Sequence, residues 1–185
     1  MAKGDQGSLV PRVVTISVCA CAIAYVDSIV DIYLRKMLPL PEWQSHVKDI
    51  PSLVSFLSGH GVFWTEQTRQ ISFFVLLIAI ALLSGSSTRQ KLGFFLWGLS
   101  VSELFHYISM YLLIKWPRSL GTWDVIALFP QPWVAPVYVP VIISLAMIMC
   151  AIFLMREDDK GSAKPSRPKP ASKSASKSKK KESSD

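Results

Sequence analysis

The stretch "FFLWGLSVSELFHYISMYLLIKW", residues 94–116, decides the fold class of this chain. At about 1.5 Å per residue, it is long enough to cross the roughly 30 Å hydrocarbon core of a bilayer as one helix. Near its middle it carries Glu103 and His106, which lie three residues apart and therefore share a helix face. A charged group at that depth costs at least about 2.5 kcal/mol when it faces lipid, so this face is expected to turn toward other helices.

The rest of the chain has the composition of an integral membrane protein. Half of its 185 residues are hydrophobic, the mean hydropathy is +0.34, and the apolar residues come in long blocks. Four blocks are long enough to span a bilayer, at about 13–34, 65–84, 92–115 and 133–155. Pro136 and Pro140 are expected to loosen the first turns of the last block. The sequence therefore predicts an all-α integral membrane protein, a four-transmembrane-helix bundle over residues 13–155.

The first block also allows a different interpretation. Lys3 and Arg12 precede a short apolar run, and Ala22-Ile23-Ala24 has the small residues of a signal-peptide cleavage site. Cleavage of residues 1–24 is therefore an alternative. Because the apolar character continues to Leu34, which a cleaved signal does not need, an uncleaved helix is favoured.

The positive charges predict the orientation in the membrane. Residues 1–12, the link at 84–91 and the tail at 156–185 hold 14 of the 20 Lys and Arg residues, and an even number of spans puts all three on one side. The positive-inside rule then places both termini in the cytoplasm, in a cell (inner) membrane. The tail is rich in Lys, Ser and Pro, so it is expected to be disordered and to contact anionic lipid headgroups. It has no interleaved aromatic residues, so nucleic-acid binding is not expected.

The opposite face is predicted to carry two loops rich in Trp and Pro. Five tryptophans there have the placement of an interfacial belt: Trp43, Trp64, Trp116, Trp123 and Trp133. Asp49 as a cap and Gly59 as a stop predict a short interfacial helix between them. Asp124 is expected to cap a second short helix that starts at Val125.

Six polar residues are the candidates for a site within the membrane: Asp27, Asp31, Glu66, Arg69, Glu103 and His106. Asp27 and Asp31 are four residues apart and share a face, while His106 is expected about 15 Å from the outer boundary. Three predicted spans thus bring titratable groups into the outer half of the bilayer. Because the acids outnumber the cations available there, a protonated carboxyl, first of all Glu103, or a bound cation is expected.

Several functions are compatible with these groups. They could form a polar network that fixes helix order, a metal or haem site, a pocket for a small or lipid-like ligand, or a proton or ion path. A di-iron site would need a second Glu-x-x-His motif, and Cys19, Cys21 and Cys150 have no metal-binding spacing. No metal or cofactor is therefore predicted. No common catalytic motif is present either.

The outer loop before the last block carries a set of spaced motifs. They are Trp116-Pro117, Ser119-Leu120, Trp123-Asp124, Pro130, Pro132-Trp133, Pro136-Val137 and Pro140. Together with "YLRKMLP" at 33–39 and "TEQTR" at 65–69, they resemble a pattern in small bacterial inner-membrane proteins of uncharacterised function. The resemblance covers most of residues 30–150 and implies a four-helix membrane protein without a known activity. It matches Arg35, Glu66, Arg69 and Glu103, but His106 departs from the aromatic pair of that group.

The leading expectation is a non-enzymatic accessory subunit whose polar network specifies the helix arrangement and contacts a membrane protein partner. The alternative is a membrane-embedded enzyme or binding protein for a lipid-soluble ligand, with an acid/base or metal site around Glu103 and His106.

Overall fold

The computed structural model describes residues 9–37, 50–128 and 130–162, with side chains up to residue 156. Its helices are α1 (Leu9–Met37), α3 (Ile50–Gly59), α4 (Phe63–Ser84), α5 (Thr88–Ile114) and α6 (Tyr138–Ser162), and its strands are β1 (Trp123–Ala127) and β2 (Trp133–Pro136). The predictions for residues 1–8, for Trp43 and Asp49 and for the tail from residue 163 lie outside the described residues.

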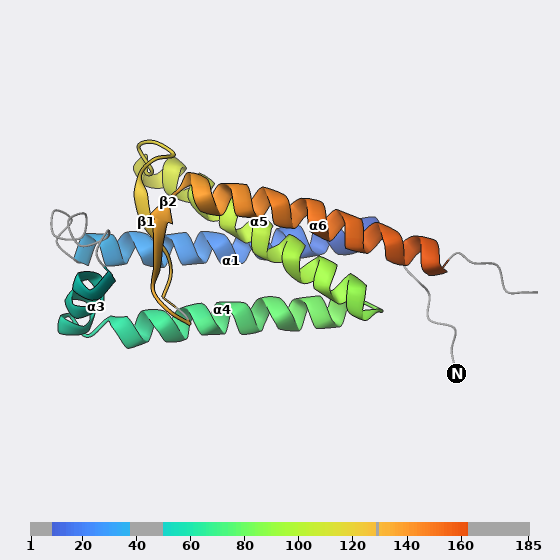
Figure 1. The fold of residues 1–185 in the computed structure, drawn as a ribbon, viewed down its shortest axis with the longest axis horizontal. Helices are drawn as coiled ribbons and strands as arrows, with labels where there is room; N and C mark the ends of the chain where they lie inside the picture. Colours follow the sequence, from blue (N-terminus) through green and yellow to red (C-terminus); the bar gives the residue numbers. More distant parts are fainter. Residues whose placement is uncertain (1–8, 38–49, 129, 163–185) are drawn as a thin grey trace, which may run out of the picture.

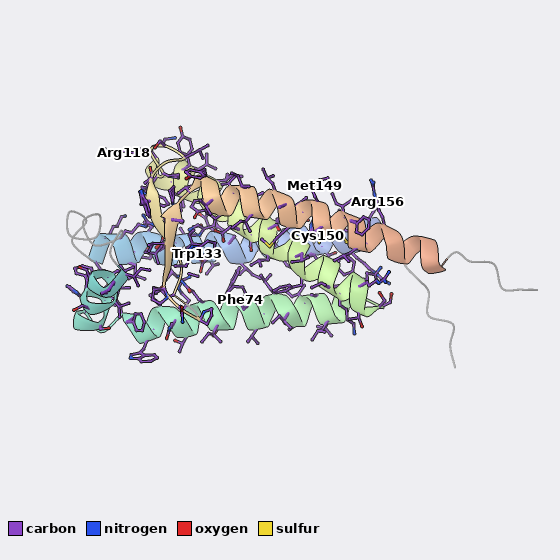
Figure 2. All side chains as sticks on the ribbon, viewed as in Figure 1. Phe74, Arg118, Trp133, Met149, Cys150 and Arg156 are labelled. Atoms are coloured by element: carbon purple, nitrogen blue, oxygen red, sulfur yellow. The ribbon has the colours of Figure 1, made fainter. Side chains whose placement is uncertain are left out.

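The helices are those of a membrane protein, as the sequence predicts. In the described part of the chain, α1, α4 and the Tyr138–Arg156 part of α6 are long and apolar enough to cross a bilayer. Their outward side chains are apolar, such as Met149 on α6, which is 68% exposed (Figure 2). The 27-residue α5 is equally long but more polar, since it carries Glu103 and His106.

The four long helices lie roughly lengthwise beside one another (Figure 1). We call the end with α3 and the two strands the hairpin end, and the opposite end, where α1 and α5 begin and α6 ends, the tail end. Helix α5 crosses the molecule diagonally: it lies near α4 at the tail end and near α6 and the strands at the hairpin end (Figure 1). All four long helices come together at the tail end, where residues from each of them share one core cluster.

Small residues permit the close packing at the tail end. Gly93 of α5 lies so near α6 that a Cβ there would stand 2.8 Å from Met155 Cγ and 3.3 Å from the carbonyl oxygen of Ala151. Phe94 is 1% exposed and joins a cluster with Ile16, Ala81, Ala151 and Met155 of the three other long helices. Small residues at such contacts let helix backbones approach closely, as is typical in membranes.

The segment after α5 forms a β-hairpin, which corrects one prediction. The short helix expected from Val125 is absent from the described chain, because β1 pairs with β2 in antiparallel register, with Asp124 opposite Ala135. β-branched Val125 and Ile126 suit an extended strand. The fold is mostly helical, consistent with the predicted all-α membrane protein, and the two-stranded hairpin is its one sheet among the described residues.

The last long helix also starts later than predicted. Residues 133–136 belong to β2, and α6 begins at Tyr138. Pro136 has no N–H for a helix and fits the end of an edge strand, whereas Pro140 lies in the first turn of α6, where proline is tolerated. The short helix α3 is present where the sequence predicts one, and its Leu53 and Leu57 pack against Leu128 of the hairpin. Its location in a membrane interface stays a prediction.

Candidate functional site

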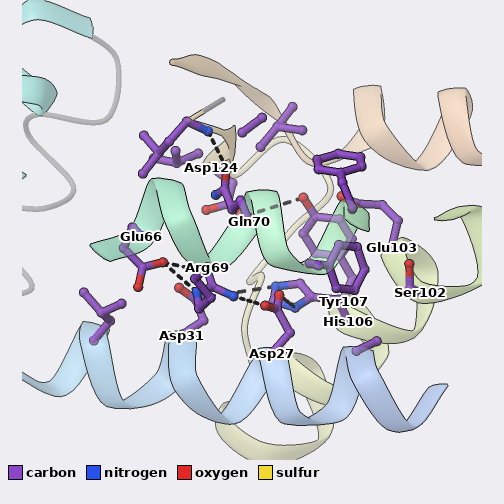
Figure 3. A pocket seen from close by; sticks show the side chains of 18 of the residues that line it. Asp27, Asp31, Glu66, Arg69, Gln70, Ser102, Glu103, His106, Tyr107 and Asp124 are labelled. Atoms are coloured by element: carbon purple, nitrogen blue, oxygen red, sulfur yellow. Dashed lines mark hydrogen bonds and ion pairs between the residues drawn. The ribbon is translucent and has the colours of Figure 1, made fainter. Parts of the chain in front are cut away.

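A cavity of about 130 Å³ lies at the hairpin end, between α1, α4 and α5 and against β1. Its polar lining combines side chains that are far apart in the sequence (Figure 3): Asp27, Asp31, Arg35, Glu66, Arg69, Gln70, Ser102, Glu103, His106, Tyr107 and Asp124. All six candidates predicted from the sequence belong to this set. The divergence of α5 from α4 toward the hairpin end leaves room for the cavity (Figure 1).

Helix α1 supplies one charged face of the cavity. Asp27, Asp31 and Arg35 follow one another at intervals of four residues and therefore lie on one side of the helix. Arg35 Nε donates to Asp31 Oδ2 over 2.9 Å. Ser28, which follows Asp27 on α1, is fully buried. Its Oγ lies 3.2 Å from His106 Nδ1 of α5. The contact fixes the position of α1 against α5.

Arg35 also reaches the hairpin. Its NH2 group donates to Asp124 Oδ1 over 2.9 Å, and its guanidinium lies 3.8 Å above the centre of the Trp116 ring. The ring of Tyr107 also stacks on Trp116. The Tyr107 hydroxyl lies 3.5 Å from Asp124 Oδ2. Asp124 is only 4% exposed, and this burial raises the pKa of its carboxyl, although Arg35 acts in the opposite direction. Arg35 thus joins α1 to β1.

Helix α4 supplies the opposing face. Arg69 pairs with Glu66 one turn before it, over 2.7 Å, and with Asp27 of α1 across the cavity. Two glutamines of the same helix hold the end of β1: Gln67 Nε2 donates to the carbonyl oxygen of Leu128 over 3.0 Å, and the Leu128 N–H donates to Gln70 Oε1 over 2.8 Å. Helix α4 is therefore fastened both to α1 and to the hairpin.

Helix α5 supplies the remaining side. His106 Nδ1 lies 3.4 Å from Asp27 Oδ2, and His106 Nε2 lies 4.0 Å from Asp31 Oδ2. Glu103, one turn earlier, extends toward the cavity (Figure 3). Among the described residues it makes no hydrogen bond or ion pair, and its main electrostatic partner is the imidazole of His106. Glu103 therefore differs from the other carboxyl groups of the site.

The lining carries more acids than cations. Five carboxyl groups, those of Asp27, Asp31, Glu66, Glu103 and Asp124, face two guanidinium groups and one imidazole. The excess of carboxyl groups over cations is thus larger than the sequence predicts, because Asp124 also lines the cavity. Within the described ranges, no three His, Cys, Asp or Glu side chains form a group that could hold a metal ion.

Five polar residues of the lining are not among the six sequence candidates: Arg35, Gln70, Ser102, Tyr107 and Asp124. The sequence predicts a helix cap at Asp124 and gives Arg35 as a position matched by the resemblance, while Tyr107 and Ser102 carry no signal of their own. Tyr107 follows His106 directly, and Gln70 lies four residues after Glu66, so helical spacing from the known candidates was the available signal. Asp124 had only its place in the Trp-Asp motif.

The tryptophans of the predicted belt have different surroundings. Trp64, Trp123 and Trp133 are 72%, 40% and 43% exposed, as an interfacial position would allow. Trp116 is half-buried and covers Arg35, so it belongs to the site as well. The belt itself stays a prediction.

Comparison of the chain with protein-family models, curated proteins and solved structures gave no match. The function is therefore argued from the cavity.

Proposed function

We propose that the protein is a four-helix inner-membrane protein, with α5 as the fourth span and both termini in the cytoplasm. Helix α5 packs along α1 and α6, two helices that can cross a bilayer, and the titratable groups near its middle, Glu103 and His106, line the cavity. The tail end joins the basic link before α5 and the ends of α1 and α6 that lead to the basic terminal segments (Figure 1). This gathering of positive charge supports the cytoplasmic placement, and the resemblance to small bacterial inner-membrane proteins agrees with it.

We further propose that the protein binds a small ligand in the cavity at the hairpin end. One observation carries this proposal: charged side chains from three helices and a strand line a cavity of about 130 Å³ that their ion pairs leave unfilled. A purely structural network gains most when its members pack directly, because unfilled space loses contacts and stability. A concave site with convergent polar groups between helices is the usual form of a binding pocket.

The accessory-subunit function remains the second candidate. It is favoured by the ion pairs that cross between elements, Arg35 with Asp124 and Arg69 with Asp27, because such pairs fix how helices and hairpin fit together. In that case, the cavity would stay empty and a protein partner would cover the outer surface. Contacts of the basic tail with anionic lipids are compatible with either function.

The test is to fill the cavity without touching its charges. Ala127 of β1 lines the cavity and is half-buried, and a strand accepts an aromatic residue well. Full-length protein would be purified in mild detergent and analysed by native mass spectrometry for bound small molecules. We expect the wild-type protein to retain a bound molecule and the Ala127→Phe variant to lose it.

The matched control is Leu120→Phe, in the same outer segment but 61% exposed and outside the cavity lining. We expect it to retain the bound molecule. Equal thermal unfolding temperatures of the two variants would show that Ala127→Phe has not simply unfolded the protein. A wild-type protein that carries no small molecule but a stoichiometric protein partner would overturn ligand binding and favour the accessory subunit.

A further inference from the structure

Glu103 is the group in the cavity whose charge is not balanced. It lines the cavity, and its side chain is half-buried. Its side chain keeps partial accessible surface, and it makes no hydrogen bond or ion pair with any described residue. A carboxylate in such surroundings loses its hydration without gaining a donor, so it either takes up a proton or requires a cation.

The other carboxyl groups already have cationic partners. Asp31 and Asp124 share Arg35, and Asp27 and Glu66 share Arg69. Both guanidinium groups of the lining, those of Arg35 and Arg69, are thus used by four acids. The imidazole of His106 lies beside Asp27 and Ser28. It is the main electrostatic partner of Glu103, but among the described residues no ion pair joins these two side chains. The lining carries fewer cations than carboxyl groups, and Glu103 is the acid that pairs with neither guanidinium group.

Aromatic rings line the same space. Phe73 and Phe74 of α4 are half-buried and face the cavity together with Tyr107 of α5. Ring faces attract an organic cation, most strongly where water is excluded. A metal ion would need several oxygen or nitrogen ligands, and the described residues offer no such group. A half-buried carboxylate beside aromatic rings therefore suits an ammonium group better than a metal ion.

We propose that the cavity takes an organic ammonium group, with Glu103 as its counter-ion and Phe73, Phe74 and Tyr107 as the surrounding rings. This inference rests on the proposed ligand-binding function and specifies the ligand class. The ammonium group has two possible sources: the headgroup of a membrane lipid such as phosphatidylethanolamine, or a free amine. Both present the same chemistry to Glu103.

The first experiment compares ligands on the wild-type protein and needs no variant. Choline and ethanolamine are titrated into full-length protein in mild detergent, beside 3,3-dimethylbutanol, the uncharged carbon isostere of choline. We expect at least one ammonium probe to bind at least tenfold more tightly than the isostere. In a parallel arm, native mass spectrometry compares retention of phosphatidylethanolamine and phosphatidylglycerol.

The two arms distinguish the sources. Binding of a free ammonium probe indicates a soluble amine, and selective retention of phosphatidylethanolamine alone indicates the lipid headgroup. Equal binding of the neutral isostere, together with equal retention of the two lipids, would overturn the ammonium proposal.

The second experiment uses Glu103→Gln, which keeps the shape and removes the charge. We expect it to weaken the preferred ammonium ligand at least tenfold, and Phe74→Leu to weaken it by about threefold because one ring is lost. The control is Tyr111→Phe, one turn beyond Tyr107 on α5, 53% exposed and outside the cavity lining. Unchanged affinity in Glu103→Gln would overturn the role of Glu103.

These outcomes separate the inference from the function on which it rests. If the wild-type protein carries a neutral or anionic molecule that Ala127→Phe displaces, ligand binding stands and the ammonium inference fails. If neither the purification nor the titrations show any bound molecule, both proposals fail.

Discussion

The two ends of the helix bundle are packed differently: the tail end is close-packed and apolar, and the hairpin end encloses a cavity with charged walls. At the tail end, glycine and alanine bring four helices into direct contact around Phe94. At the hairpin end, α5 leaves α4, and charged side chains meet around a cavity. The comparison teaches that small residues set the closeness of the helices at one end, so that a space with charged walls can persist at the other.

The largest effect is expected from breaking the central ion pair of the hairpin end. Arg35→Met leaves Asp124 and Asp31 without their shared cation in a buried place, so the free energy of unfolding should fall by about 3–5 kcal/mol. Unfolding in detergent with a chemical denaturant measures it.

The same variant has a defined pH dependence. Without Arg35, the largest influence that lowers the pKa of Asp124 is lost, while burial and the charge of Asp31 still raise it, so its folded-state pKa moves further above the unfolded value. The folded state then binds more protons than the unfolded state, so stability falls as pH rises through this window and recovers in acid. The loss in Arg35→Met should therefore be smaller at acidic pH than at neutral pH. A loss that does not vary with pH would show that Asp124 is not the group left unpaired. The control is the double variant Arg35→Met with Asp124→Asn, which lacks both the guanidinium group and the carboxyl group.

The tail end is tested by adding bulk at Gly93. In Gly93→Val, the new side chain meets Met155 and the Ala151 carbonyl of α6, so we expect a loss of about 1–3 kcal/mol on the same unfolding assay. Gly59→Ala is the control, because a Cβ there has no neighbour within 4 Å. A Gly93→Val protein as stable as Gly59→Ala would contradict the close contact of α5 and α6.

A smaller effect is expected where the hairpin is fastened to α4. Gln70→Leu removes the acceptor for the Leu128 N–H, which should cost about 1 kcal/mol. Amide hydrogen exchange should show faster exchange at Leu128, with no change in the helix pair α5 and α6. Unchanged exchange at Leu128 would mean that another acceptor replaces Gln70.

The smallest effect is expected for Tyr107→Phe. Its hydroxyl lies 3.5 Å from Asp124 Oδ2, at the limit of a hydrogen bond, while its ring stacking on Trp116 is kept. We expect a change below about 0.5 kcal/mol in unfolding. A loss of unfolding free energy as large as that of Gln70→Leu would show that the hydrogen bond from the Tyr107 hydroxyl to Asp124 is stronger than its length of 3.5 Å suggests.

The sequence predicts the helical parts well because they depend on local patterns. Long apolar blocks mark the helices, and the cost of charge in lipid marks Glu103 and His106 as inward-facing. The same argument brings Asp27 and Arg69 into one site. Each of these predictions needs only helical spacing and an estimate of depth.

Helical spacing does not predict the hairpin, because the hairpin depends on pairing between two separate segments of the chain. Asp124 reads locally as a helix cap, and only the register with Ala135 places it in a strand that faces Arg35. The contact joins residues 89 positions apart in the sequence. The cavity likewise follows from the diagonal path of α5, which helical periodicity does not encode.

The two glutamine contacts to Leu128 have a mechanical consequence. Gln67 and Gln70 occupy both the carbonyl oxygen and the N–H of one residue, as a neighbouring strand would. A slide of α4 along its own axis by one residue, about 1.5 Å, would pull on both bonds at once. The hairpin thus resists an axial shift of α4, and because Arg69 lies between the two glutamines on that helix, the same two bonds hold its guanidinium at a fixed height beside the cavity.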